Sequence, residues 1–374
     1  MTRRYLGDDA QARLAEARLE AVRRIGAIAA STRSEFVVVC GDVFESNQVD
    51  RRTIARALDA LGAIPVPVYL LPGNHDPLDG ASLYRSAAFA EHAPEHVHVL
   101  TDRRPRRVRP GVEVVGVPWT SKRPDADLVA TACAELAPEP GTTRVLVAHG
   151  AVDALTRERS DPATIALAPA EAALAEGRIH YLALGDRHSR TRVGTSGRVY
   201  YAGAPEPTDF DEVDPGHVLA VEIDDTRVEV TPHRVGTWHF VRRERIPAGG
   251  QGDLDALEDW LAELPGRERS VLRLGFEGTL DLRDAARLDA IVERAADRFA
   301  AVQRWERPGQ LAVLPADGDF ADLALSGFAK RAVEDLRVRI RGSGEEAGVA
   351  RDALALLVRL AAARGDDDRA GDPS

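Results

Sequence analysis

Hydrophobic and polar positions follow a repeated order of helical and extended segments along the first part of the chain. Apolar residues recur every three or four positions between Leu14 and Ile28, which predicts a helix over 9–31, and a second helix is predicted over 51–61. Short aliphatic runs predict strands at 36–40, 66–71, 96–100, 112–117, 144–148, 178–184, 198–202 and 217–223. Strands that alternate with helices favour an α/β fold, here a layered sandwich with its helices outside.

The pattern changes after residue 235. Strands over 239–246 and 270–276 alternate with helices over 253–263 and 283–298, which predicts a small α/β cap domain over 236–325. Two amphipathic helices separated by Gly342-Ser343-Gly344 are predicted within 326–365, and we expect the polar tail at 366–374 to be disordered. The first domain accordingly spans 1–235.

Polar residues suited to metal binding directly follow four of the predicted strands. The four segments are Gly41-Asp42, Gly73-Asn74-His75-Asp76, His149-Gly150 and Gly185-Asp186-Arg187-His188. Aspartate, asparagine and histidine supply the oxygen and nitrogen donors that divalent transition ions accept. Because loops at strand ends are where such side chains converge, the order of the segments predicts a metal centre.

A pair of divalent metal ions would explain why aspartate, asparagine and histidine occur together in these segments. Two ions roughly 3.5–4 Å apart need a bridging carboxylate, for which Asp42 is the candidate. Asn74, His149, Asp186 and His188 are the candidate terminal ligands. Such a pair activates water and polarises a phosphoryl group, so the predicted chemistry is phosphoester hydrolysis.

Four further residues are candidates for catalysis and substrate binding. His75 follows the Asn ligand and is placed to protonate a leaving alkoxide, and Asp76 is expected to orient its imidazole. Arg187 and Arg190 flank the predicted site and are candidates to bind substrate phosphates.

This ordered series resembles the calcineurin-like metallophosphoesterase family, and its spacing and long C-terminal extension resemble the SbcD-like exonuclease subunits of DNA repair. The resemblance implies a DNA repair exonuclease that hydrolyses phosphodiester bonds with a water activated by two divalent ions. It also implies that the cap domain helps to choose the DNA structure. An SMC-like ATPase is the implied partner of the C-terminal helices, and a homodimer is a further expectation.

Two positions depart from the family pattern. The opening D-x-H is missing, and Asp8 and Asp9 are better interpreted as a helix cap. We expect the first strand and its D-x-H to lie upstream of Met1. Asp186 stands where the family has a histidine, and this harder ligand favours manganese over zinc. One ion then keeps Asp42, Asn74, His149 and Asp186, whereas the other keeps only Asp42 and His188.

Two other functions stay open at this point. A nucleotidase or cyclic-nucleotide phosphodiesterase would use the same centre, although small substrates need no such C-terminal extension. A non-catalytic, nuclease-like subunit is the other alternative, because the D-x-H is absent.

Composition narrows the class of protein. The 374 residues carry a net charge of −11, which argues against a broadly basic nucleic-acid surface. The arginine cluster at 103–109 is expected to be an exposed loop or edge. No apolar run is long enough to span a membrane, and the two cysteines, Cys40 and Cys133, make no disulfide framework. These features predict a cytoplasmic location.

Overall fold

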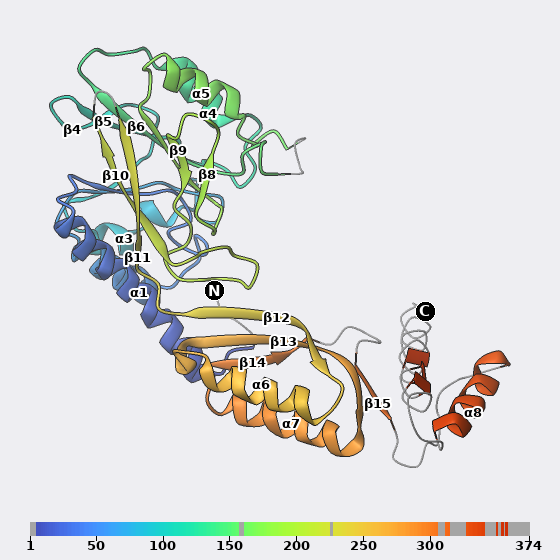
Figure 1. The fold of residues 1–374 in the computed structure, drawn as a ribbon. Coiled ribbons are helices and arrows are strands. Elements are labelled where there is room, and N and C mark those ends of the chain that lie inside the picture. Colours follow the sequence, from blue (N-terminus) through green and yellow to red (C-terminus); the bar gives the residue numbers. More distant parts are fainter. Residues whose placement is uncertain are drawn as a thin grey trace. The chain divides into compact units, whose positions relative to one another are not determined.

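The computed structural model describes residues 5–156, 161–224, 227–305, 311–314, 327–340, 349–350, 353–354 and 356–357. The chain forms two compact units (Figure 1). Among the described residues, unit 1 comprises 11–238, and unit 2 comprises 5–10 together with the part that begins at His239. Each unit is described separately below.

Unit 1 contains three sheets. The first is parallel, in the order β1-β2-β3, and consists of β1 (Val37–Val39), β2 (Val68–Leu70) and β3 (Val97–Val99). The second has the order β4-β5-β6-β7-β9-β8 and consists of β4 (Arg106–Arg109), β5 (Val112–Gly116), β6 (Thr143–His149), β7 (Tyr181–Gly185), β8 (Thr191–Val193) and β9 (Val199–Tyr201). The third is an antiparallel pair of β10 (His217–Ile223) and β11 (Val228–Arg234).

Helices cover the outer faces of the two larger sheets. The α-helices of this unit are α2 (Arg51–Gly62), α3 (Ala87–His92), α4 (Leu128–Glu135), α5 (Leu167–Ala175) and most of α1 (Asp8–Ser31), and a short 3-10 helix, η1, spans Leu83–Arg85. Local sequence fixes where several of them begin. Asp50, Ser86 and Asp127 are N-caps whose side chains accept hydrogen bonds from the first-turn amides of α2, α3 and α4.

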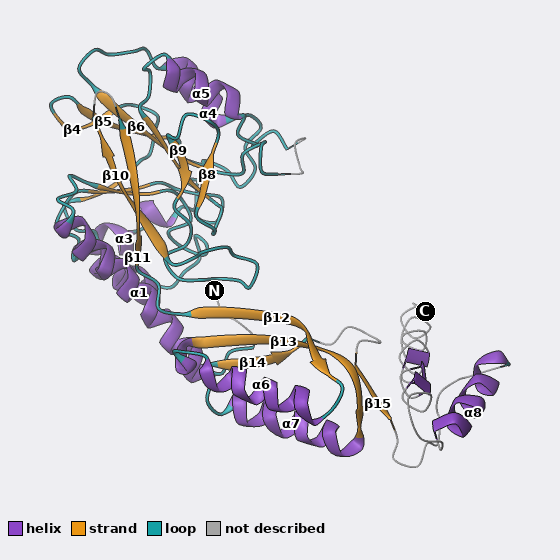
Figure 2. Ribbon diagram, viewed as in Figure 1, coloured by secondary structure: helices purple, strands orange, loops and turns teal. Residues whose placement is uncertain are grey.

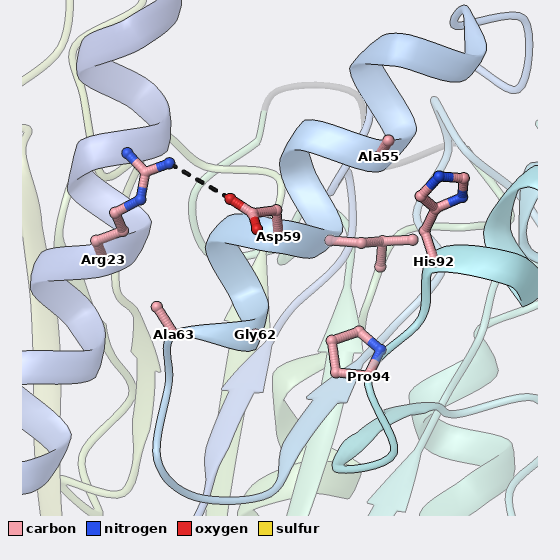
Figure 3. Close-up of a pocket in the computed structure, with 8 residues that line it drawn as sticks. Arg23, Ala55, Asp59, Gly62, Ala63, His92 and Pro94 are labelled. Carbon is pink, nitrogen blue, oxygen red and sulfur yellow. Dashed lines mark ion pairs between the residues drawn. The ribbon is translucent and has the colours of Figure 1, made fainter.

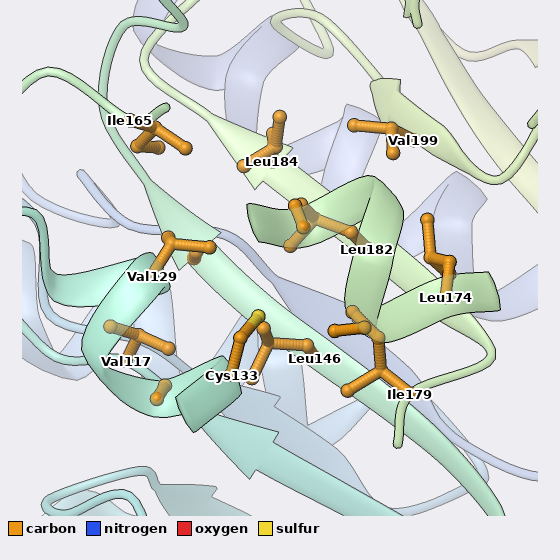
Figure 4. Packing of buried hydrophobic residues seen from close by; sticks show 14 of the residues in the cluster. Val117, Val129, Cys133, Leu146, Ile165, Leu174, Ile179, Leu182, Leu184 and Val199 are labelled. Atoms are coloured by element: carbon orange, nitrogen blue, oxygen red, sulfur yellow. The ribbon is translucent and has the colours of Figure 1, made fainter. Parts of the chain in front are cut away.

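Three hydrophobic clusters define the layers of unit 1. Val22 and Ile25 of α1 pack with residues of α2, α3 and the first sheet, and Tyr69, Val114 and Val147 belong to a cluster between the two larger sheets. The third cluster packs α4 and α5 against the outer face of the second sheet (Figure 4). The order helix, sheet, sheet, helix confirms the predicted α/β layered sandwich (Figure 2).

Unit 2 is a second α/β arrangement. Its elements are β12 (His239–Ala248), α6 (Gln251–Glu263), the 3-10 helix η2 (Arg267–Arg269), β13 (Ser270–Asp281), α7 (Leu282–Ala296), β14 (Ala301–Arg304), β15 (Leu311–Leu314) and α8 (Phe328–Ile340). The strands are parallel, with β13 in the middle. Leucines of α6 and β13 share a core with Leu288 and Ile291 of α7, as the strand–helix–strand–helix pattern of the sequence requires.

The sequence pattern missed five strands, β4, β8, β11, β14 and β15, which are short or polar. The predicted helix after residue 348 is described only at a few positions, and the Gly342-Ser343-Gly344 linker and the 366–374 tail lie outside the described residues. No helix in the described part of the chain combines the length and the apolarity needed to cross a membrane.

The arginine cluster at 103–109 forms part of the edge strand β4 and the loop before it. Arg103 pairs with Glu135, Arg106 with Asp102, and Arg109 with Glu35. Because acidic partners neutralise these arginines on a partly exposed surface, the cluster is a solvated edge of the sheet.

Candidate metal centre

Four of the predicted ligands meet at the carboxyl ends of four strands. His149 is the last residue of β6, and Asp42, Asn74 and Asp186 follow β1, β2 and β7. The Nε2 atom of His149 lies 2.7 Å from Asn74 Oδ1, 3.4 Å from Asp42 Oδ2 and 3.8 Å from Asp186 Oδ1. The strands within each sheet are parallel here, so their carboxyl ends share one edge and residues far apart in sequence come together.

Glycine is required beside these ligands because the loops touch. A Cβ atom on Gly41 would lie 2.2 Å from His149 Nδ1, and one on Gly73 would lie 2.3 Å from Asp42 Oδ1. A Cβ atom on Gly185 would lie 1.7 Å from the carbonyl oxygen of Cys40. The glycines of the sequence motifs therefore allow the backbones to approach closely.

Both aspartates have a left-handed backbone conformation, which three other described residues that are not glycine share. Asp42 has φ 52° and Asp186 has φ 95°, a region that side-chain-bearing residues rarely adopt. Such conformations persist where the surrounding structure imposes them, and they cluster at functional sites. Both carboxylates are thus held in place by their loops.

His149 is held from two sides. Its side chain is fully buried, and its Nδ1 donates a hydrogen bond to the Cys40 carbonyl at 2.8 Å. Trp119 packs edge-on against the ring and donates from Nε1 to the His149 carbonyl at 2.7 Å. With its proton on Nδ1, the neutral imidazole turns the Nε2 lone pair towards oxygen acceptors. A cation between these groups, either a proton or a metal ion, would satisfy the Nε2 lone pair and the oxygens together.

The electrostatics agree with this conclusion. Burial lowers the pKa of His149, but the hydrogen bond and charge of Asp42 outweigh it, and the net pKa is raised. Burial likewise raises the pKa of Asp42, yet the bonds from His149 and His75 bring it below its usual value. The pKa of Asp186 is raised, chiefly by burial, and the charge of Asp42 adds to this.

The donors converge on one atom, Nε2 of His149. Among the described residues, no group of three or more His, Cys, Asp and Glu side chains could hold a metal ion as the side chains stand. Asn74 adds a further oxygen donor, at 2.7 Å from His149 Nε2. Ligands of one ion lie about 2.0–2.2 Å from it, so distances of 2.7–3.8 Å from His149 Nε2 to the three oxygens are compatible with a shared ion. Among the described residues, the candidate ligands of a second ion are Asp42 and His188.

His188 lies on the exposed side of the centre. Its Nδ1 is 3.0 Å from Glu212 Oε1 and 2.6 Å from Thr208 Oγ1. The hydrogen bond to Glu212 raises the pKa of His188, and the charges of Asp186 and Asp42 add to this. Sequence reasoning missed Glu212 and Thr208, because no motif or spacing ties them to the histidine.

The structure assigns His75 and Asp76 to different networks. The His75 amide donates to Asp42 Oδ1 at 2.9 Å, and its Nδ1 lies 3.1 Å from the Glu45 carbonyl. Asp76 is fully buried and accepts hydrogen bonds from the Gly73 amide, the Phe44 amide and the Tyr84 hydroxyl. The expectation that Asp76 orients the His75 imidazole is therefore wrong, because its carboxylate instead joins the two ligand loops.

The two candidate substrate-binding arginines lie next to His188. Arg187 Nε donates to Thr191 Oγ1 at 2.8 Å, and Arg190 donates twice to Asp214 Oδ2, at 3.0 and 2.5 Å. Arg190 would have to share its guanidinium with Asp214 to bind a phosphate. Contact of either arginine with substrate stays a prediction.

A shallow hollow on unit 1 lies apart from these ligands. Residues of α1, α2 and the end of α3 line it, and Arg23 forms an ion pair with Asp59 at 3.7 Å (Figure 3). None of the predicted site residues is among those that line it.

Comparison with known protein families gives a match over most of unit 1. Residues 12–220 match the calcineurin-like phosphoesterase family. We found no match among curated protein sequences. The solved structures similar to the chain include two that each have a TM-score of 0.37 and each cover 59% of it. One is TT1561 of Thermus thermophilus, with 11% identity over 94% of that protein, and the other has 16% identity over 95% of its own chain.

Proposed function

The chain belongs to the calcineurin-like phosphoesterase family, and from this premise we propose that Asp42, Asn74, His149 and Asp186 hold a divalent ion for phosphoester hydrolysis. Members of this family generally use divalent metal ions, and the fold is that of a metal-dependent phosphoesterase. The convergence of three oxygen donors on the buried Nε2 of His149 is the observation that carries the proposal.

The residues around the ion have separable tasks. When bound, a divalent ion would polarise the phosphoryl oxygens and lower the pKa of a water molecule. Asp42 and Asp186 bring negative charge to it, and Asn74 adds a neutral oxygen. His75 is exposed, and with its Nδ1 proton donated to Glu45 it presents Nε2 as the atom that can exchange a proton with the leaving oxygen.

We propose DNA ends as the substrate and manganese as the ion. The resemblance of the motif series to SbcD-like subunits supports this, as does the presence of a second folded unit beyond the hydrolase unit. A nucleotidase or cyclic-nucleotide phosphodiesterase remains the alternative with the same centre. We propose an SMC-like ATPase as the partner of the C-terminal helices, where α8 exposes Phe328 at 81% and Val338 at 68%.

A non-catalytic subunit is favoured by one observation. Among the described residues, a second ion has two candidate ligands, Asp42 and His188, and His188 is half exposed. If the chain holds a single ion, it would bind substrate without efficient turnover.

Hydrolysis assays would separate these proposals. The protein is incubated with Mn²⁺ and linear duplex DNA, nucleoside monophosphates or an aryl phosphodiester, beside an Asn74→Ala variant. We expect release of nucleotides from DNA, and a loss of at least about 100-fold in the variant, since even outer partners of a metal site are worth 10–100-fold. Equal turnover by both proteins would refute the assigned centre. Preference for monophosphates would favour a nucleotidase.

A further inference from the structure

We propose that residues 203–214, which we term the His188 loop, form a positioning element in which Glu212 fixes the tautomer of His188. Glu212 would hold the Nδ1 proton, so that Nε2 carries the lone pair that a second cation can accept. Only the assignment of Nε2 to a cation rests on the proposed function. The positioning role rests on contacts within unit 1.

Glu212 is committed to His188 by its own burial. Its side chain is 6% exposed, whereas that of His188 is 48% exposed. A carboxylate so far removed from water needs hydrogen-bond donors. The donors are His188 Nδ1 at 3.0 Å, the Thr208 amide at 2.8 Å and the Thr208 hydroxyl. Thr208 Oγ1 also lies 2.6 Å from His188 Nδ1, so both side chains face the same nitrogen.

The His188 loop also holds the backbone around the histidine. The Ala204 amide donates to the His188 carbonyl at 2.9 Å, and the Val213 amide donates to Ser189 Oγ at 2.9 Å. Arg190 pairs with Asp214 at the end of the loop. Residues 188–190 therefore contact the His188 loop at both of its ends.

Gly203 marks the closest approach of these two segments. A Cβ atom there would lie 2.7 Å from the His188 carbonyl oxygen and 2.9 Å from the Arg190 amide nitrogen. Its φ of +87° is a conformation that glycine adopts readily. The loop is thus built to lie against residues 188–190.

A second buried carboxylate secures the loop to the rest of unit 1. Glu206 is 2% exposed and accepts hydrogen bonds from the amides of Thr237 and Trp238 at 2.8 and 3.0 Å. Arg24 of α1 also reaches Glu206, at 3.3 Å, and donates to the Val235 carbonyl at 2.6 Å. This attachment holds the loop that carries Glu212 against the rest of unit 1, independently of His188.

The expected consequence concerns the weaker of two cation sites. A carboxylate that accepts the second ring proton of a histidine ligand fixes the ring and raises its basicity, and loss of such a partner typically costs 10–100-fold in metal affinity. The second ion has few other ligands, so its affinity depends strongly on His188. Glu212 contacts His188 and Thr208, and no hydrogen bond in the described part of the chain links it to His149, which would hold the other ion.

The first test measures the tautomer of His188 directly. Nitrogen-15 NMR is recorded on the metal-free protein at a pH where the imidazole is neutral, for wild type, Glu212→Ala, Glu212→Gln and the control Glu222→Ala. Glu222 lies exposed on β10. We expect the Nδ1–H form in wild type, in the control and in Glu212→Gln, whose amide oxygen still accepts the proton, and a shift to the Nε2–H form in Glu212→Ala. An unchanged tautomer in a folded Glu212→Ala protein would overturn the proposal.

The second test measures Mn²⁺ binding by calorimetry on the same four proteins. We expect two sites in the wild type, and we expect Glu212→Ala to weaken the lower-affinity site by 10–100-fold and to leave the tighter site unchanged. A single site in the wild type, unaffected by Glu212→Ala, would overturn the assignment of His188 Nε2 to a second cation. Equal weakening of both sites would show a general structural defect and contradict the positioning role. If Glu212→Ala does not fold, Thr208→Ala is used, with a smaller change expected in the same direction. Absence of Mn²⁺ binding in wild type would refute the proposed function, while the tautomer measurement would still decide the role of Glu212.

Discussion

The two histidines of the candidate centre are supported in different ways. The His149 side chain is fully buried, and its partners are the backbone carbonyl of Cys40 and the Trp119 ring. His188 is half exposed, and its partners are side chains of the loop that contains Thr208 and Glu212. Nδ1 is the supported nitrogen in both residues.

This difference predicts that His149 is the more rigid of the two and that His188 is easier to alter. A ligand supported by the core cannot be altered without disturbing the fold, because its partners also hold the sheets. A ligand supported by a surface loop can be changed with little effect on folding, since few core contacts depend on it. We therefore expect substitutions at His149 to change the stability of the fold, and substitutions at His188 to change mainly the properties of the candidate centre.

The largest loss of stability is expected from a substitution that overpacks the buried surroundings of His149. Gly185→Ala would place a Cβ atom 1.7 Å from the Cys40 carbonyl oxygen, and both groups belong to strand ends that cannot move apart freely. We expect a loss of about 3 kcal/mol or more in the free energy of unfolding, at the upper end for overpacking. Urea denaturation measures it. Gly80→Ala is the matched control, because a Cβ atom there meets nothing within 4 Å. Similar stability of both variants would show that the two loops are not tightly packed.

Removing each histidine tests the comparison itself. His149→Ala leaves the Cys40 carbonyl without its buried donor, so we expect a loss of about 1–3 kcal/mol in unfolding free energy. For His188→Ala we expect a smaller loss of about 1 kcal/mol or less, because buried Glu212 keeps the Thr208 amide and hydroxyl as donors. Thermal and urea unfolding of the metal-free proteins measure both. Equal destabilisation would remove the distinction drawn here.

A pH series sharpens the comparison further. The folded-state pKa of His149 lies above the ordinary value of 6.5, so its contribution to stability is complete below pH 6.5 and is lost as the pH rises through the raised pKa. The metal-free protein should therefore lose stability on the alkaline side of pH 6.5. His149→Gln should remove most of this slope, and His188→Gln should remove less, since the His188 side chain is half exposed and water screens its charge. A slope that persists in the double variant would assign it to other groups.

The smallest change in stability is expected at the exposed ion pair at the end of the His188 loop. Arg190 and Asp214 form an ion pair with side chains 37% and 43% exposed. Such pairs contribute about 0–1 kcal/mol, so Arg190→Gln should leave the unfolding free energy nearly unchanged. If Arg190 also binds substrate, KM should rise while kcat is kept. Steady-state kinetics measure this, and an unchanged KM would exclude Arg190 from substrate binding.

Much of the fold was predictable from residue patterns. Amphipathic spacing located α1 and α2, and aliphatic runs located β1, β2 and β6, because burial on one face imposes a period on the sequence. Strand β4 was missed because its arginines carry no apolar period, and the partners that define it lie elsewhere in the chain. Strand pairing depends on non-local contacts that a local pattern does not contain.

The candidate site was predictable only in its ligands. Residue type and glycine neighbours pointed to Asp42, Asn74, His149 and Asp186, which the structure brings together, and their role as metal ligands stays a prediction. Asp76 was assigned to His75 because the two are adjacent in sequence. The folded chain turns its carboxylate into the interior, where Tyr84 and two amides bind it.

By itself, the sequence determined the family, the layered α/β class and the candidate metal ligands, because each leaves a local signature of residue type and spacing. Only the tertiary structure decided which groups hold those residues. Cys40 contributes a carbonyl that every residue possesses, and Glu212 is an ordinary loop glutamate until the chain folds. A hydrogen-bond partner is determined by distance in the folded structure, which the separation of two residues in sequence does not predict.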